Sequence, residues 1–157
     1  MAYEIPCDLL NRYLADFASR YSADDVIDFL EAARALKVLV VGETIIDEYQ
    51  YCEMIGRATK DPIQATLYQS TEKFAGGIIA VANHIAKFCD EVSMVTILGD
   101  RDSDERFVRE NLSSNVEPKF FYKANSPTIV KRRWVEGFLM QKLFELYEMN
   151  DEDLDSK

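Results

Sequence analysis

Apolar and polar positions follow two different rhythms, and the change comes near residue 37. Before that point apolar residues recur every three or four positions, as on one face of an α-helix. The first set is Ile5, Leu9, Leu10, Tyr13, Leu14, Phe17 and Tyr21, and the second is Val26, Ile27, Leu30, Ala33 and Leu36. Ser22 and Asp25 form a capping-box pattern between the two sets. Residues 1–36 are therefore predicted to form two helices, either a linker or a collar that docks on the main fold.

From Lys37 onward the pattern is that of strands. The run VLVV, residues 38–41, is wholly apolar and β-branched or leucine, which is typical of a strand buried on both faces of a parallel sheet. VSMVTIL, residues 92–98, is a second strand of this kind. Between them IDEYQYCEM (46–54) and PIQATLYQSTEKF (62–74) alternate roughly and flank the polar turn GRATKDP. This arrangement predicts a pair of antiparallel strands.

Helical and strand patterns alternate in the rest of the chain. A helix is predicted after Gly77, and SDERFVRENL (103–112) predicts a surface helix capped by Ser103. KFFYKA (119–124), TIVKRRWVE (128–136) and LMQKLFELYEM (139–149) predict three further strands. The whole is an α/β domain that carries a flap of extra strands. Two clearly buried strands are fewer than a doubly wound sheet usually has, so we expect part of a larger fold.

Composition excludes several classes of function. The 157 residues carry a net charge of −10, whereas a nucleic-acid-binding surface needs a basic patch. Cys7, Cys52 and Cys89 are far apart and lack a CxxC spacing, which favours reduced thiols in a cytoplasmic protein over disulfides or zinc. No apolar run approaches the ~18 residues that span a bilayer, and the N-terminus lacks a secretory pattern. We expect neither nucleic acid nor membrane as a partner.

Two short motifs are candidates for chemistry. Glu43 and Asp47 follow the first buried strand, and ligands of open α/β sheets bind at the carboxyl ends of strands. A carboxylate there can accept hydrogen bonds from two sugar hydroxyls, although both acids can equally be solvated turn residues. Gly76 and Gly77 precede a helix whose first turn has free N–H groups, so a ligand can approach the main chain closely. The alternative is a simple strand-to-helix turn.

Other polar residues are given structural roles. His84, the single histidine, lies on the helix after the glycines and is expected to pack or face solvent. The acidic stretch GDRDSDERF lacks the glycine and the final glutamate of an EF-hand loop. No GxGxxG and no P-loop sequence occurs either, which disfavours a Rossmann-like nucleotide-binding domain. We therefore predict no metal site.

Taken together, the motifs resemble the PfkB-type, ribokinase-like carbohydrate kinases, and most closely their heptose-7-phosphate kinase branch. The resemblance runs from about Lys37 to Asn150 and rests on VVGETIIDEYQYC, GRATKDPI, EKFAGGIIAVANHIA and SPTIVKRRWVEG. It implies a partial doubly wound sheet with an antiparallel β-flap, or lid, preceded by two helices. The implied divisions are 1–36 for the helices, 37–150 for the substrate-binding and lid portion of a kinase domain, and 151–157 for an acidic tail.

The resemblance also implies roles for individual residues. Asp47 matches the acid that binds sugar hydroxyls, Gly76 and Gly77 match the glycine pair under the sugar, and Lys131 matches a basic position near it. Arg57 and Lys60, in the flap turn, are assigned to a substrate phosphate from their charge alone. The chain departs from the branch at three positions. Glu43 stands where the branch usually has Asp, and Glu145 stands where it commonly has Arg. Ala80 stands where it usually has Asn, and in this chain Asn83 follows one helical turn later.

The activity implied is transfer of phosphate from ATP to a sugar hydroxyl, with ATP and Mg as cofactors of a complete enzyme. The catalytic Asp of these kinases lies in a Gly-Ala-Gly-Asp stretch, and no such stretch occurs in this sequence. Phosphoryl transfer needs nucleotide, metal and acceptor in line, so we expect no catalytic residue, no cofactor and no turnover for this chain alone. The expected partners are a sugar or sugar phosphate and, through the lid strands, a second copy of the chain. The alternative is a non-catalytic module that forms a homodimer through its lid strands.

Overall fold

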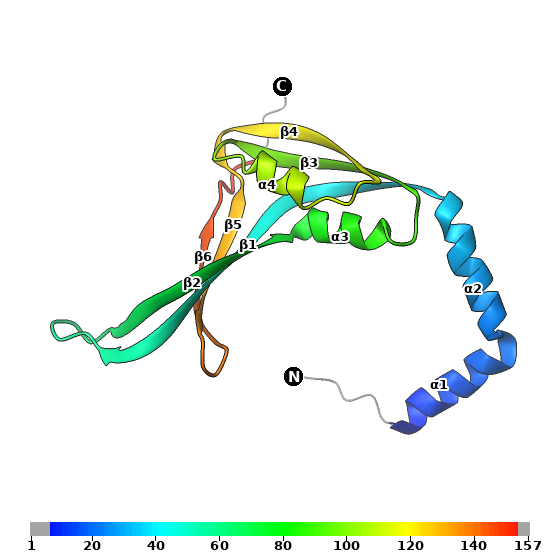
Figure 1. Cartoon of the computed structure of the whole chain (residues 1–157), viewed down its shortest axis with the longest axis horizontal. Coiled ribbons are helices and arrows are strands. Elements are labelled where there is room, and N and C mark those ends of the chain that lie inside the picture. Colours follow the sequence, from blue (N-terminus) through cyan, green and yellow to red (C-terminus); the bar gives the residue numbers. More distant parts are fainter. Residues whose placement is uncertain (1–6, 154–157) are drawn as a thin grey trace.

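The computed structural model describes residues 7–153 and has three parts, which we call the arm, the core and the lid (Figure 1). The arm holds α1 (Cys7–Arg20), α2 (Ala23–Ala32) and the short 3₁₀ helix η1 (Ala33–Ala35). The core and the lid share one six-stranded sheet. Ile5, assigned to the first helix, and the end of the acidic tail lie outside the described residues.

A single long strand connects the core to the lid. β1 (Lys37–Arg57) pairs in parallel with β3 (Glu91–Arg101) over residues 37–43. From Ile45 to Cys52 it lies between β2 (Gln64–Gly76) and β5 (Ile129–Glu136). The apolar run and the first flap segment, predicted as separate strands, are thus two halves of one strand.

The core is a parallel sheet of β1, β3 and β4 (Val116–Pro127), with α3 (Gly77–Ile85) packed on one face (Figure 1). The interior lies between this face and the helices α3 and α4 (Glu105–Glu110). It contains Ile78, Ile79, Ala82, Cys89, Val92, Met94, Leu98, Val108 and Val116, with Val38 and Val40 packed against them. Val38 and Val40 alternate with Leu39 and Val41, which are exposed on the other face. The expectation of burial on both faces therefore holds for one face only.

The lid has the order β2-β1-β5-β6, where β6 is Gln141–Glu148. β2 and β6 are antiparallel to their neighbours, which confirms the antiparallel flap, while β1 and β5 run parallel. β2 and β1 form a long hairpin that projects from the core (Figure 1). The three strands predicted after Pro118 are confirmed as β4, β5 and β6, and the first of them belongs to the core.

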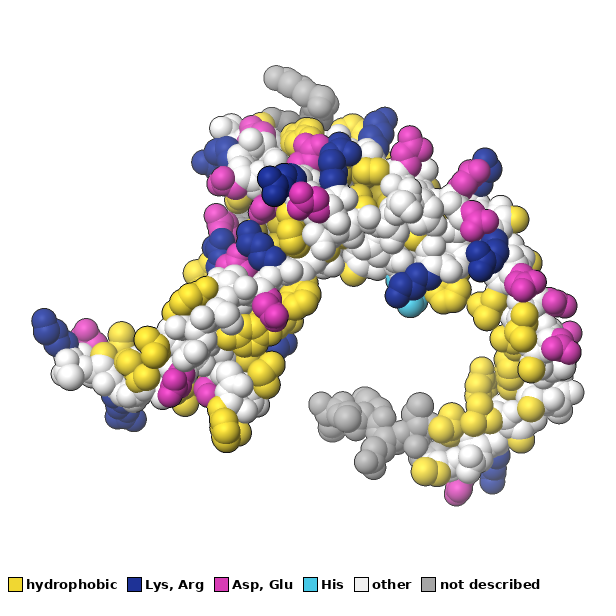
Figure 2. Space-filling model, viewed as in Figure 1, with side chains coloured by type: hydrophobic (Ala, Val, Ile, Leu, Met, Phe, Trp, Pro, Cys, Tyr) yellow, Lys and Arg dark blue, Asp and Glu magenta, His cyan; other side chains and the backbone are white. Residues whose placement is uncertain are grey.

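The arm lies beside the core without being buried in it. Ser22 caps α2 as predicted: its hydroxyl accepts the N–H of Asp25 at 3.1 Å, and the Asp25 carboxylate accepts the Ser22 N–H at 2.7 Å. Neither α1 nor α2 contains a buried residue. The Asp90 N–H, donated to the Arg34 carbonyl at 3.1 Å, ties η1 to the core. Apolar side chains line the side of the arm that faces the hollow of the molecule (Figure 2).

Two further sequence predictions are answered by the fold. α4 was expected to be capped by Ser103, but its N-cap residue is Asp104, in the left-handed conformation. Ser103 still accepts the N–H of Glu105 at 3.4 Å, so the prediction was wrong by one residue. No helix among residues 7–153 is long and apolar enough to cross a membrane.

Candidate functional site

Asp47 and the glycine pair meet where β1, β2 and α3 come together. Ile45 pairs with Gly76 across the β1–β2 ladder, and Asp47 lies two residues further along the same face. A β-carbon on Gly76 would collide with Oδ2 of Asp47. The absence of a side chain at Gly76 therefore makes room for the carboxylate of Asp47 as well as for any ligand beside it.

Gly77 has a different requirement. Its φ of 54° lies in the left-handed region, and a β-carbon there would lie 2.8 Å from the carbonyl oxygen of Glu43. This sharp turn starts α3 directly from the end of β2. The first N–H groups of α3 have no side-chain cap at Gly76, and the helix dipole makes this end positive. A carboxylate and a helix N-terminus thus lie side by side, a combination of acceptor and donors that suits hydroxyl groups.

Arg133 on β5 is the nearest charged partner of Asp47. Its Nη1 donates to Asp47 Oδ1, and its Nε donates to Glu145 Oε1 on β6 at 2.7 Å. The hydrogen bond to Asp47 is the main reason that the pKa of Arg133 is raised. The pKa of Glu145 is lowered, first because the Tyr147 hydroxyl donates to its Oε2 at 2.7 Å and then because of Arg133.

Sequence reasoning did not include Arg133 among the site residues. The run Lys131 to Arg133 alternates between the two lid faces, and only the register with β1 shows which members reach Asp47. Lys131 is the direct neighbour of Asp47 on β5 and shares its face. Its ammonium lies 5.3 Å from the ring centre of Tyr147, and it forms no ion pair within residues 7–153. Lys131 therefore places a cation beside Asp47 on the same face of the lid.

The remaining predicted site residues lie elsewhere. Arg57 ends β1 ten residues beyond Asp47, which at about 3.3 Å per residue is roughly 30 Å along the strand. Lys60 follows in the hairpin turn, so the fold does not bring either cation to Asp47. Glu43 is exposed in the core half of β1. Its side chain lines a hollow of about 800 Å³ with Val41, Ile97, Phe121 and Lys123 on the core face away from α3.

Asn83 and His84, on α3, do not point to the site through any contact that the structure shows. The Asn83 amide donates to the Asn111 carbonyl at 2.7 Å and accepts the N–H of Ser113 at 2.8 Å. His84 is exposed, and its ring lies edge-on against Phe88 at 5.6 Å. Asn83 thus holds the loop after α4. It does not take the place of the asparagine that the resemblance leads one to expect at position 80, where this chain has Ala80.

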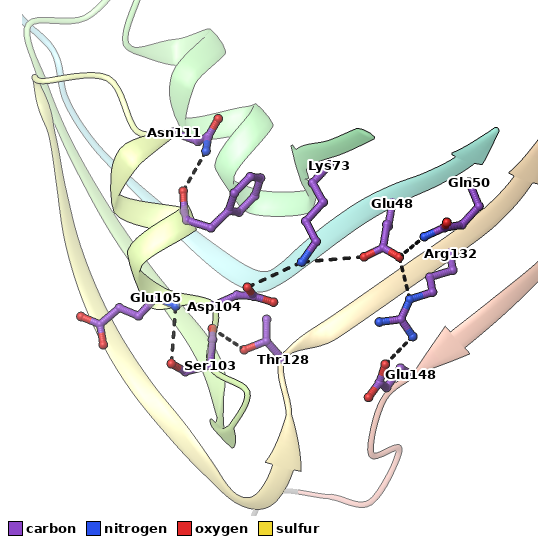
Figure 3. A network of polar contacts seen from close by, with 11 residues as sticks. Glu48, Gln50, Lys73, Ser103, Asp104, Glu105, Asn111, Thr128, Arg132 and Glu148 are labelled. Carbon is purple, nitrogen blue, oxygen red and sulfur yellow. Dashed lines mark hydrogen bonds and ion pairs between the residues drawn. The ribbon is translucent and has the colours of Figure 1, made fainter. Parts of the chain in front are cut away.

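A second charged cluster lies on the opposite face of the lid (Figure 3). Glu48 has a nearly buried side chain, and Arg132 donates to it at 2.7 Å and to Glu148 at 2.6 Å. Lys73 lies 3.7 Å from Glu48 and 3.9 Å from Asp104, at the start of α4. These contacts join the lid to the loop before α4, so this cluster fixes how the lid meets the core.

The described residues offer no metal centre. Within residues 7–153 no group of three or more His, Cys, Asp or Glu side chains is placed so that it could hold a metal ion. Cys52 and Cys89 are buried free thiols, and Cys7 is an exposed one. The site at Asp47 therefore consists of a carboxylate, main-chain donors and Lys131.

Comparison with curated proteins finds relatives named Bifunctional protein HldE. No family model matches the chain. The Bifunctional protein HldE of Shewanella piezotolerans (strain WP3 / JCM 13877) is 33% identical over 107 residues, which are 68% of this chain and 22% of that protein. The same-named protein of Psychromonas ingrahamii (strain DSM 17664 / CCUG 51855 / 37) is 28% identical over 76% of this chain. The chain thus spans about a quarter or less of the curated relatives it matches.

Solved structures that share the fold include ribokinases. A putative ribokinase from Agrobacterium tumefaciens superposes with a TM-score of 0.54 at 12% identity, over 78% of this chain and 40% of that one. Ribokinase from Cryptococcus neoformans var. grubii serotype A, solved in complex with ADP, also gives 0.54, at 21% identity over 74% and 34% of the two chains. These likenesses confirm the predicted partial ribokinase-like fold, and together with the curated relatives they support the resemblance to PfkB-type sugar kinases.

Proposed function

Because this chain has a partial ribokinase-like fold and relatives among PfkB-type sugar kinases, we propose that it is the sugar-binding portion of a carbohydrate kinase. The complete enzyme would transfer phosphate from ATP to a sugar hydroxyl. In this proposal residues 37–150 are the substrate-binding and lid portion, the preceding helices form a separate arm, and residues 151–157 are an acidic tail. We place the protein in the cytoplasm, where a sugar kinase meets ATP.

One observation carries the proposal: Asp47 lies directly against the side-chain-free entrance of α3. Asp47 Oδ2 accepts no hydrogen bond from residues 7–153, so it is available to a hydroxyl donor. The first N–H groups of α3 can donate to the same ligand. Neighbouring hydroxyls that both donate and accept are the groups that this arrangement suits. Lys131, on the same face, would attract an anionic substituent of the sugar.

We further propose that the substrate is a sugar or sugar phosphate related to heptose 7-phosphate. The sequence motifs resemble the heptose-7-phosphate kinase branch, and the curated relatives are named Bifunctional protein HldE. Ala80 differs from that branch, which points to a substrate that differs at the hydroxyl this position would contact, whereas Glu43 lies away from Asp47. Arg57 and Lys60 lie at the tip of the β1–β2 hairpin, far from Asp47. They would contact a substrate phosphate only if it were bound at the site of another copy of the chain, or if the lid bent toward its own site.

The chain is proposed to be inactive alone. It has no Gly-Ala-Gly-Asp stretch to supply a catalytic base. ATP and Mg would therefore be held by other residues of a complete kinase, and binding is the function we assign to this portion.

Isothermal titration with D-ribose, D-mannose 6-phosphate and sedoheptulose 7-phosphate tests the proposal. We expect at least one to bind at millimolar concentration or better. Asp47→Asn should weaken that binding about tenfold, since a hydrogen bond to a charged group contributes roughly 1.5–3 kcal/mol. Glu53→Gln, an exposed acid on the same strand, is the matched control and should leave binding intact. Failure of all these sugars to bind the wild-type chain would contradict the proposal.

A second candidate function is a homodimeric interaction module, favoured by the surface of the lid. Its outer strands β2 and β6 have free edges, which invite pairing with another chain. The β5–β6 loop exposes Phe138, Leu139 and Met140, although the buried Glu136 holds it by accepting the N–H groups of Phe138 and Leu139 at 3.0 and 2.6 Å. Light scattering over a range of concentrations tests this function, and a strict monomer would exclude it.

A further inference from the structure

We propose that Arg133 is a positioning residue, which holds the Asp47 carboxylate in the orientation that sugar binding requires, and that Glu145 and Tyr147 hold Arg133 in turn. The inference rests on the proposed sugar-binding function and adds residues that the resemblance did not supply. It is built on a continuous line of contacts across the lid. The line runs from β6 through β5 to Asp47 on β1, beside Gly76 at the end of β2.

The geometry of arginine explains the first step. Its guanidinium is planar and rigid, with donors that point in fixed directions. Nε of Arg133 binds Glu145 on one side, and Nη1 binds Asp47 on the other. The face of the guanidinium lies 5.4 Å from the ring centre of Tyr49, and the side chain is 14% exposed. Two carboxylates and one ring thus fix the position of Arg133 before any ligand arrives.

The two carboxylate oxygens of Asp47 have different neighbours. Oδ1 accepts from Arg133, while Oδ2 is turned to the space beside Gly76. A free aspartate would sample several rotamers, and ordering it would reduce the affinity for a ligand. Since Arg133 orders Asp47 in advance, Oδ2 already faces the α3 N-terminus when the ligand arrives. Arg133 itself has both carboxylates as partners, so it is expected to act through Asp47 and not on a substrate anion.

Glu145 on β6 holds the far side of the Arg133 guanidinium. Here Glu145 divides its oxygens as Asp47 does: Oε1 accepts from Arg133 and Oε2 from the Tyr147 hydroxyl. The substitution seen in the sequence as a departure therefore becomes part of the support for Asp47.

Arg132 provides an internal control for the experiment. It is adjacent to Arg133, points to the opposite lid face and also bridges two carboxylates, Glu48 and Glu148. Lysine at either position keeps the charge but loses the two-sided fork. If Arg133 were merely structural, Arg133→Lys and Arg132→Lys would have the same effect. Both would lower the melting temperature, and neither would change the ligand affinity of the folded protein.

The first measurement is the affinity for D-mannose 6-phosphate, by titration of both lysine variants. Arg133→Lys should weaken binding about tenfold, and Arg132→Lys should leave it within about twofold. The effect of Arg133→Lys should disappear in an Asp47→Asn background, because the two residues act as one unit. Equal losses of affinity in the two lysine variants, or full additivity with Asp47→Asn, would overturn the proposal.

The second measurement needs no sugar, so it separates failure of this inference from failure of the proposed function. Amide signals of Gly76 and Gly77 in nitrogen-15 NMR spectra should shift in Arg133→Lys and Glu145→Gln, since the carboxylate beside them moves. They should stay in place in Arg132→Lys. If the wild-type chain binds no sugar but these shifts occur, the positioning role stands without the binding function. If the amides do not move, Arg133 does not position Asp47.

Discussion

The core and the lid are both built on β1, but apolar packing stabilises the first, whereas chains of charged pairs cross the second. In the core, Met94 and Ile79 are completely buried between the sheet and α3. In the lid, Arg132 and Arg133 each bridge two carboxylates, one on each face. The lid strands bury Ile46, Cys52, Val130 and Val135, while ion pairs and the stacking of Trp134 on Phe144 connect their other side chains.

This difference separates the tasks of the two regions. Apolar packing is insensitive to a polar ligand, so the core can hold Gly76 and Gly77 in place whatever binds beside them. Charged pairs are directional, and in the lid Arg133 orders Asp47, which the β1–β5 register places beside Lys131 on one face. The proposed site lies at the junction because it uses a rigid helix end from one region and an ordered charge from the other.

Met94→Ala should have the largest effect on stability. Met94 is fully buried among Ile79, Leu98 and Val108, so its truncation removes apolar contacts and leaves a cavity. We expect a loss of about 2–5 kcal/mol in the free energy of unfolding. Urea unfolding followed by circular dichroism measures it. A loss below about 1 kcal/mol would mean that the core is loosely packed, contrary to the comparison.

Glu48→Gln should have the next largest effect, and it tests the lid. Removing the charge leaves Arg132 with Glu148 alone and weakens the Lys73 contact between lid and core. We expect a loss of about 1–3 kcal/mol, because a hydrogen bond to a charged group in a nearly buried place is lost. Fluorescence of Trp134, the single tryptophan, reports unfolding of the lid, where its ring stacks on Phe144 at 4.5 Å.

The exposed Glu53→Gln is the control for this prediction as well. It neutralises an acid on the same strand whose carboxylate accepts only from the Gln69 amide, at 3.2 Å, among residues 7–153. Its effect should stay within about 0.5 kcal/mol. If both variants unfold at the same urea concentration, the Glu48 cluster does not stabilise the junction of lid and core.

The contrast between the regions also explains what the sequence could predict. Periodicity predicted the helices, the core strands and the flap, because burial imposes a repeat of two or of three to four residues. The Ser22 capping box followed from a local pattern, whereas the placement of Asp47 and Gly76 at one site was implied by the family resemblance. Arg133 was missed because its partners Asp47 and Glu145 are 86 and 12 residues away in sequence, and only strand register joins them.

Other errors have the same physical origin. Val38–Val41 read as buried on both faces because a wholly apolar run does not show which neighbours cover it. The phosphate role of Arg57 and Lys60 was assigned from charge, yet the length of the β1–β2 hairpin carries both away from Asp47. Charge and periodicity are local properties, whereas a site depends on how far the strands extend and which strands pair.

Tyr147→Phe should have a small effect that depends on pH. The Tyr147 hydroxyl is the main reason that the pKa of Glu145 is lowered, so its removal should raise that pKa toward the ordinary glutamate value. A lowered pKa stabilises the fold above the unfolded-state value, near 4.3, and this contribution is lost as the pH falls through the folded-state value. The variant should therefore be less stable than wild type at neutral pH and equal to it in acid. Carbon-13 NMR titration of the Glu145 carboxyl measures the shift, and an unchanged pKa would contradict the contact.

The double variant Leu39→Lys, Val41→Lys should have almost no effect on unfolding, and for that reason it tests the comparison most sharply. Both side chains are more than half exposed on the core face that no helix covers, at 62% and 68%. If that face is open in solution, the change in unfolding free energy should stay within about 0.5 kcal/mol for each position. A parallel sheet normally has both faces covered, so wild-type protein should associate through this face at high concentration, and the lysines should suppress that association. Light scattering of both proteins measures it, and the control is Thr66→Lys, Ser70→Lys on β2, which adds the same charge at two exposed positions of the lid. A large loss of stability would show that the face is packed against part of the protein, and the core would then be sealed on two sides instead of one.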